Sequence, residues 1–482
     1  MDTLIDPHDW AASEFGHAAI PDARNVARLV QMAQRVAERP LPKVSAVFEA
    51  PPELEAAFDF LENERIRPQA LVASCQRATA RRARGLARIL VPVDEVLLTL
   101  PDPHATRGMG SVGERATGTR GLIVMDAVAL DERGTPLGLA AMITWARPLV
   151  RDPRPHHRRP ALEKEIRYWI HARASVREGL RGEAPDTEIV FLHDCAADAW
   201  PVLLDVVVRD SQERERTVLR SSQDRRASAQ KGSPSHLRSL LRRAPERWRI
   251  RQWIPAKHGQ AARRAKLEIR MREVTLDLEL APSSVHTKVT LWAVQVHEVG
   301  RLGRGVVRLD WVLLTDRPLR TRAEALEVVR WYTLRWRVED HHKAWKGSGS
   351  DIERTQLRGR ESVERWMAIH AAVSARALAL VHRARDPVEG EAPATAAYSA
   401  SELTALRVRR KAHGMDTPSE LTVAEATRLV AIMGGFRPIS DRRYGPMTLG
   451  RGLERLLFAA EVVRAIQADT GPPQKQQRSR RK

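Results

Sequence analysis

The chain has 482 residues, more than one hydrophobic core usually serves, so we expect two to four structural units. Its formal net charge is +20 and its pI is near 10.8. A polyanion such as DNA or RNA would offset this charge better than the alternative partner, a membrane surface. No apolar run is long enough to span a bilayer, and residues 1–15 lack the layout of a secretion signal. Only Cys75 and Cys195 occur, which are too few for a disulfide framework or a Cys-rich zinc site. We therefore expect a cytoplasmic protein.

The first predicted unit covers residues 1–80 and consists of helices separated by proline-bearing loops. Asp22 can cap a helix in which four arginines fall within about 60° of one another, at about 100° per residue. The apolar residues of this helix lie mostly on another face, so the basic stripe is free to meet phosphates. A merely solvated charged face explains the same pattern. The arginines of the stripe are Arg24, Arg28, Arg35 and Arg39.

Two apolar strands are predicted to end in aspartates. The run Ile89–Val93 precedes Asp94, and Pro92 within it favours an edge strand or a bulge. The run Glu188–His193 precedes Asp194. An aspartate after a strand is more often a turn former or a helix cap, so each residue alone indicates little.

The remaining elements give an α/β order with antiparallel parts. Residues 122–130 and 137–145 predict a hairpin, and a helix is expected at residues 163–174. An Arg-rich, β-rich insertion is expected at about residues 200–317. Helices are predicted from 322 to about 346, from 361 to 383 and within 402–466, and a disordered basic tail at 471–482.

The most informative stretch is WYTLRWRVEDHHKAWK, residues 331–346. On one continuous helix its polar residues project within about 80° of each other, whereas the apolar ones form a different stripe. A carboxylate among a phenol, a guanidinium and ammonium groups suits a metal ligand beside phosphate oxygens. Ordinary ion pairs on a solvated helix are the alternative. The polar residues are Tyr332, Arg335, Glu339, Lys343 and Lys346.

The spacing of Tyr332, Arg335, Glu339 and Lys346 matches the YREK signature of bacterial DDE transposases. The chain resembles the cut-and-paste insertion-sequence branch of that family, in the RNase H-like, retroviral integrase superfamily. The resemblance extends over nearly the whole chain. Other stretches that carry it are FGHAAIPDARNVARLV (15–30), GTPLG (134–138), Trp145, Arg147, EKE (163–165), Trp169, GGF (434–436), Gly445-Pro446 and GRG (450–452).

This resemblance implies a catalytic triad of Asp94, Asp194 and Glu339 that holds two Mg²⁺ ions, with Mn²⁺ able to substitute. Magnesium prefers oxygen ligands, and a pair of ions about 4 Å apart can assist both the attacking and the leaving oxygen in phosphoryl transfer. Tyr332, Arg335, Lys343 and Lys346 are then expected to contact DNA phosphates.

Two further DNA contacts follow from the resemblance alone. Trp311 corresponds to an aromatic residue placed near a flipped base, where stacking contributes about 1–3 kcal/mol. Core packing is the alternative for this tryptophan. Arg209 corresponds to an arginine near DNA, with an ordinary surface arginine as the alternative.

The resulting expectation is a multidomain α/β protein with an RNase H-like mixed-sheet core at residues 81–370. An all-α end-binding domain precedes the core, and a helical dimerisation region follows at 371–470. The expected activity is magnesium-dependent excision and strand transfer on double-stranded DNA by a homodimer. Two alternatives stay open: an RNase H-like nuclease without strand transfer, and a DNA-binding regulator that has lost activity. The second is suggested because DCAAD, residues 194–198, departs from the Asp-Arg-Glu-x-Asp pattern common in the family at the second aspartate.

Overall fold

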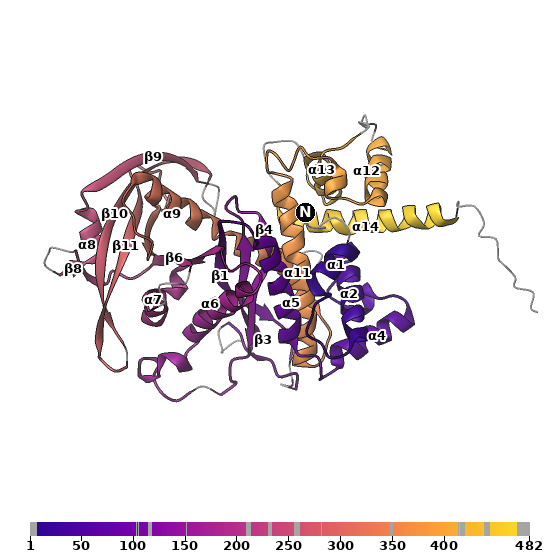
Figure 1. Cartoon of the computed structure of the whole chain (residues 1–482), viewed down its shortest axis with the longest axis horizontal. Helices are drawn as coiled ribbons and strands as arrows, with labels where there is room; N and C mark the ends of the chain where they lie inside the picture. Colours follow the sequence, from indigo (N-terminus) through magenta and orange to yellow (C-terminus); the bar gives the residue numbers. More distant parts are fainter. Residues whose placement is uncertain are drawn as a thin grey trace, which may run out of the picture. The chain divides into compact units, whose positions relative to one another are not determined.

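The computed structural model divides the chain into two compact units, shown in Figure 1. Unit 1 comprises residues 1–63, 343–357 and 369–482, and unit 2 comprises residues 64–342 and 358–368. In the part of the chain that the structure describes, no helix is long and apolar enough to cross a membrane. The described residues are 7–102, 104, 106–113, 118–150, 152–208, 214–229, 234–254, 261–280, 282–347, 350–412, 414, 420–437 and 444–469.

Unit 1 is helical at both ends of the chain, as predicted. Asp22 caps α2, because its side chain accepts a hydrogen bond from the Arg24 backbone N–H. Thr422 and Glu425 form a reciprocal capping box at the start of α13. The helices are α1 (Pro7–Phe15), α2 (Ala23–Glu38), α3 (Val44–Val47), α4 (Pro51–Glu62), α12 (Ala400–Ala412), α13 (Val423–Met433) and α14 (Pro446–Asp469).

Unit 2 is built on one mixed sheet. Its strands are β1 (Arg88–Thr99), β2 (Gly110–Ser111), β3 (Arg120–Leu130), β4 (Pro136–Trp145), β5 (Glu188–His193), β6 (Glu215–Ser221), β7 (Arg226–Ser228), β8 (Ser235–His236), β9 (Glu246–Ile254), β10 (Arg263–Glu279), β11 (His286–Glu298) and β12 (Asp310–Thr315). Its helices are α5 (Pro68–Ala83), α6 (Ile166–Arg181), α7 (Trp200–Val207), α8 (Leu237–Arg242) and α9 (Arg322–Leu334); α10 (Arg337–Lys346) and α11 (Arg360–Arg383) each contribute residues to both units.

The strand order confirms the predicted fold class. The order β4-β3-β1-β5-β6 joins antiparallel pairs on one side of β1 to parallel pairs on the other, which is the RNase H-like arrangement. Strands β7 to β12 then extend the sheet as the expected β-rich insertion, although the segment opens with the helix α7.

Two details of β1 differ from the prediction. The strand continues to Thr99, so Asp94 lies within the strand and not after its end. Because β1 pairs with both β3 and β5, Pro92 occupies a central strand, whereas the sequence favoured an edge or a bulge. Leu90 and Val93 pair with β3 in one register on either side of the proline, so the strand accommodates its missing N–H without changing register.

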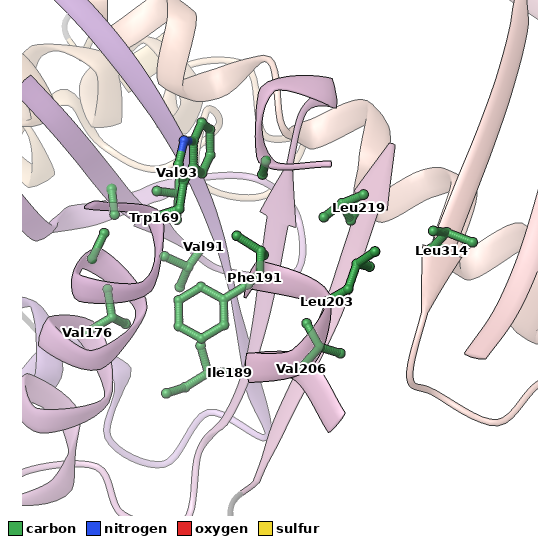
Figure 2. Close-up of a cluster of buried hydrophobic side chains, with 14 of the residues drawn as sticks. Val91, Val93, Trp169, Val176, Ile189, Phe191, Leu203, Val206, Leu219 and Leu314 are labelled. Carbon is green, nitrogen blue, oxygen red and sulfur yellow. The ribbon is translucent and has the colours of Figure 1, made fainter. Parts of the chain in front are cut away.

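Each face of the sheet carries its own hydrophobic core. One core packs α6 and α7 against β1, β5 and β6, and Figure 2 shows Phe191 between Val176 and Leu203. The second core lies on the opposite face, where α9 packs against Leu90 and Val190. Since side chains alternate along a strand, the even-numbered residues of β1 face α9.

Candidate active site

Strand alternation places two aspartates on the α9 face of the sheet. Asp94 of β1 lies directly opposite Asp126 of β3, and opposite residues in a ladder point to the same face. That face is also the face of Leu90. Asp94 is mostly buried and Asp126 is completely buried. The sheet of unit 2 therefore carries two neighbouring carboxylates, those of Asp94 and Asp126, on the face that packs against α9.

Asp194 follows β5 directly, as predicted, and also caps a short 3-10 helix, Cys195–Ala197. Its Oδ1 accepts a hydrogen bond of 2.8 Å from the Ala196 backbone N–H. The residue remains partly exposed, and its charge raises the pKa of Asp94. The helix-cap interpretation is thus correct for Asp194, and the second carboxylate oxygen is not used by the cap.

The predicted helix from Arg322 to Lys346 is broken at Arg335-Trp336. The backbone forms a tighter turn there, with hydrogen bonds between residues three apart: the Arg335 N–H donates to the Tyr332 carbonyl, and the Val338 N–H donates to the Arg335 carbonyl. A single helical projection across residues 332–346 therefore does not describe the structure. Within the predicted polar stripe, Tyr332 and Arg335 are buried, at 4 % and 6 % exposure, whereas Lys343 is exposed.

The break brings Arg335 between two of the predicted triad carboxylates. Its guanidinium donates to Asp94 Oδ2 at 2.9 Å and to Glu339 Oε1 at 2.6 Å. Burial raises the pKa of Asp94, an effect that the Arg335 charge opposes and the Asp194 charge reinforces. The three residues of the predicted triad thus belong to one electrostatic cluster, in which Arg335 bonds to Asp94 and Glu339 and the charge of Asp194 acts on Asp94.

Tyr332 lies at the edge of this cluster. Burial raises the pKa of Tyr332 to about 12, while the nearby Arg220 and Arg335 lower it. Trp311, on β12, packs against the Tyr332 ring at a centroid distance of 5.1 Å and an interplanar angle of 73°. Trp311 is only partly buried and packs against the α9 core.

Arg220 is a site residue that the sequence did not reveal. It lies on β6, its guanidinium donates to Cys195 Sγ at 3.2 Å, and its charge interacts with Asp194 and Tyr332. Nothing distinguishes it in the sequence from other strand arginines. Only the pairing of β5 with β6 brings it beside the second aspartate.

The other predicted DNA contacts are spread over the chain. Arg209 lies outside the described residues. Lys343 and Lys346 belong to unit 1, where Lys346 Nζ lies 3.2 Å from Glu353 Oε1. The stripe of α2 is exposed at Arg24 and Arg28, which bond to Asp22 and Gln31. Farther along, Arg35 pairs with Glu38 and Glu53, and Arg39 pairs with Glu49.

Metal-ligand spacing distinguishes two groups of side chains. Among the described residues, Asp126, His341 and His342 are the group whose ligand atoms all lie within 4.8 Å of one another. Asp94, Asp194 and Glu339 do not meet that spacing, consistent with the Arg335 guanidinium between two of them. Their donor atoms are nevertheless all carboxylate oxygens, the ligands that Mg²⁺ prefers.

A basic surface on β9 and β10 was also missed. Alternate residues of β9 place three arginines and a tryptophan on one exposed face, and the opposite residues of β10 add more cations. The other face packs into the α9 core. In the sequence this basic surface is visible only as the alternation of arginine with apolar residues in ERWRIRQWI, residues 246–254. The exposed face consists of Arg247, Arg249, Arg251, Trp253, Arg264 and Lys266, with the less exposed Glu268 and Arg270; we call it the β9–β10 basic face.

Comparison with known families gives two matches. Residues 7–66 match the family "Transposase DNA-binding", and residues 213–375 match the family "Transposase DDE domain". The first segment contains the basic stripe of α2, and the second contains Glu339 and the β-rich insertion but begins after Asp194. The two matched segments are thus similar to a transposase DNA-binding domain and to a transposase DDE domain, and together they support a DNA transposase. DDE transposase domains generally use divalent metal ions.

Among solved structures, the chain is similar to one described as "Cryo-EM structure of piggyBac transposase synaptic complex with hairpin DNA". The TM-score is 0.40 and the sequence identity is 9 %, over 98 % of this chain and 87 % of that chain. A likeness this weak adds nothing to the two domain matches.

Proposed function

We propose that this protein is a DNA transposase that binds the ends of a mobile element, excises it and joins it to target DNA. The observation that carries the proposal is the cluster in which Arg335 bonds to Asp94 and Glu339 and Asp194 interacts with Asp94, within an RNase H-like sheet. The residues come from β1, from the segment after β5 and from α10, which fits the order of a DDE triad. The match of residues 213–375 to a transposase DDE domain supports the assignment of Glu339.

The cluster fits divalent magnesium ions, with manganese as a substitute. Three carboxylates supply hard oxygen donors only, and Asp194 keeps an oxygen that its helix cap does not use. When bound, such ions would lower the charge barrier at the scissile phosphate and assist in activating the attacking oxygen. The residues that would hold them are Asp94, Asp194 and Glu339.

The proposed reaction begins with hydrolysis. Water attacks the phosphodiester at the element end, the P–O bond to the leaving 3′ oxygen breaks, and a 3′-hydroxyl is released. Excision also requires a cut in the opposite strand. In the joining step the 3′-hydroxyl of the element attacks a phosphodiester of the target, forming a new P–O bond, while the P–O bond to the target's own 3′ oxygen breaks and leaves a 3′-hydroxyl there. Arg335 and Arg220 are placed to orient phosphate oxygens at this cluster, since guanidinium groups bind them bidentately.

Two surfaces support DNA as the partner. In α2, the Arg24 side chain is 92 % exposed, and this helix lies within the segment that matches a transposase DNA-binding domain. The β9–β10 basic face spans about 20 Å along β9, at about 3.3 Å per residue. Within the described part of the chain, its one acid, Glu268, is already paired with Arg249 and Arg270. The remaining cations suit a phosphate backbone.

A homodimer is proposed as the working assembly. Three large apolar side chains of α14 are exposed at helical spacing: Phe458 at 65 %, Val462 at 45 % and Ile466 at 58 %. Residues spaced by four lie on one helix face, so these form a continuous apolar stripe. We propose that this stripe packs against the same stripe of a second copy of the chain, because both surfaces are apolar.

The proposal is tested with labelled DNA carrying the inverted repeats that flank the gene. We expect the wild-type protein with Mg²⁺ to release 3′-hydroxyl ends and to join them to a target duplex. The isosteric variants Asp94→Asn, Asp194→Asn and Glu339→Gln should lose both products and still bind the ends. Cleavage at wild-type rates by any of the three would remove that residue from the triad.

The same assay separates the alternatives. Cleavage without joined products would identify a nuclease that lacks strand transfer. End binding without cleavage, by a folded wild-type protein with Mg²⁺ or Mn²⁺, would identify a DNA-binding regulator.

A further inference from the structure

A second group of metal-ligating side chains lies on the α9 face of unit 2. Asp126 lies on β3, and His341 and His342 follow Glu339 on α10. His341 Nδ1 lies 2.8 Å from Asp126 Oδ2, and His342 Nε2 lies 3.3 Å from the same oxygen. One potential ligand atom from each of the three residues lies within 4.8 Å of the other two.

The cluster is buried, and two of its polar atoms lack hydrogen-bond partners among the described residues. Asp126 and His341 are 0 % exposed and His342 is 9 % exposed. Asp126 Oδ1 accepts no hydrogen bond, and His342 Nε2 approaches Oδ2 without hydrogen-bond geometry. Buried polar atoms are rarely left without a partner, so these two atoms can accept a further ligand.

We propose that Asp126, His341 and His342 bind a divalent transition-metal ion of the zinc type, at a site separate from the triad carboxylates. Two imidazoles and one carboxylate are the donor set that Zn²⁺ and Co²⁺ accept, whereas Mg²⁺ selects oxygen donors. Bidentate binding by Asp126 would use its unpartnered Oδ1 and bring the donors to four. Donors of a tetrahedral ion lie about 3.3 Å apart, given bonds of about 2.0–2.1 Å, so the His342–Asp126 pair is already at this spacing and the His341–Asp126 pair would lengthen from 2.8 Å.

The charges around the cluster also fit a cation. Asp126 contributes a carboxylate, and its two imidazole partners coordinate a metal ion in their neutral form. Asp94 lies opposite Asp126 on the same face of the sheet and adds a second negative group. An ion here would fix α10 to β3, and with it the segment that carries Glu339.

The inference does not depend on the proposed transposase activity, so it is tested by metal content. The full-length protein is stripped with chelator, then dialysed against a slight molar excess of Co²⁺ in a much larger excess of Mg²⁺, and bound cobalt is measured together with its visible absorption. We expect one equivalent per chain with the intense bands of a four-coordinate nitrogen-ligated ion. The double variant Asp94→Asn/Glu339→Gln should keep both signals.

Loss of the ligands gives the complementary test. Asp126→Asn/His342→Gln should lose the bound cobalt and its bands, whereas His193→Gln, which changes another buried histidine of unit 2, should keep them. If the ligand variant does not fold, the wild-type protein and the Asp94→Asn/Glu339→Gln variant still decide the question. No cobalt uptake by the wild type, uptake that survives loss of Asp126 and His342, or uptake lost with Asp94 and Glu339 would each overturn the proposal.

Discussion

Arg335 links Asp94 to Glu339, because one guanidinium donates to both carboxylates, at 2.9 Å and 2.6 Å. Without a cation between them, two buried carboxylates in this position would repel each other. Arg335 therefore stabilises the metal-free cluster and competes with any ion that these ligands bind.

We expect Arg335→Gln to bind Mn²⁺ more tightly than the wild type does, in the absence of DNA. Two unit charges 4 Å apart interact by about 4 kcal/mol at an effective dielectric constant of 20. Without Arg335, the carboxylates no longer lose this attraction when they bind an ion, so part of that energy increases the affinity for the metal. An increase on the order of tenfold, or about 1.4 kcal/mol, is expected by calorimetric titration. Arg337→Gln is the control, because Arg337 pairs with Asp340 and bonds to Gly134. Equal affinities in all three proteins would show that Arg335 does not compete with the ion.

The sequence predicted the strands that carry Asp94 and Asp126 and the strand that precedes Asp194, because apolar runs such as Glu188–His193 are bounded by clear turn signals. The sequence placed Asp94 at the end of its strand, but the strand continues for five more residues, all of which pair with β3. Helical periodicity likewise could not show the break at Arg335, where neither glycine nor proline occurs.

Residues that depend on pairing between distant segments were the ones missed. Asp126 looks like one polar residue in an apolar strand, and only its register opposite Asp94 reveals its place. Arg220 and the β9–β10 basic face depend in the same way on which strands are neighbours. Local patterns carry no information about such pairing.

His370 should make the protein less stable in mild acid. Burial lowers the pKa of His370 to about 3, so the folded protein leaves it neutral while the unfolded chain protonates it below about pH 6.5. Its contribution to the free energy of unfolding thus falls as pH decreases from 6.5 towards 3, by about 1.4 kcal/mol per pH unit, and is constant above 6.5. Denaturant unfolding of the wild type and His370→Gln at pH 7 and pH 5 measures the difference. The variant should lose less stability between the two pH values, and identical losses would contradict the assignment.

The apolar stripe of α14 should control self-association. Phe458→Asp/Val462→Asp places two charges in the stripe, which would be buried and unpaired in the proposed dimer. We expect this variant to sediment as a monomer in the presence of paired ends, where the wild type forms a dimer. Val408→Asp is the control, because Val408 is an exposed valine of α12, 61 % accessible and outside the stripe. A dimer that survives the double substitution would assign the contact to another surface.

The β9–β10 basic face should contribute salt-dependent, sequence-independent affinity for duplex DNA. Arg247, Arg251 and Lys266 are exposed on it and have no acidic partner within the described part of the chain, so Arg247→Gln/Arg251→Gln/Lys266→Gln removes three unpaired cations and leaves the Glu268 pairs intact. Each phosphate contact contributes about 0.9 to the slope of log K against log salt concentration, so the slope should become shallower by between about 1 and 3. The measurement is fluorescence anisotropy with a duplex that lacks the inverted repeats, from low to physiological salt. The matched control Arg301→Gln/Arg304→Gln/Arg322→Gln changes the net charge equally at exposed positions of unit 2 outside this face. If both triple variants shift the slope alike, the effect comes from net charge, and the β9–β10 basic face is not a DNA contact.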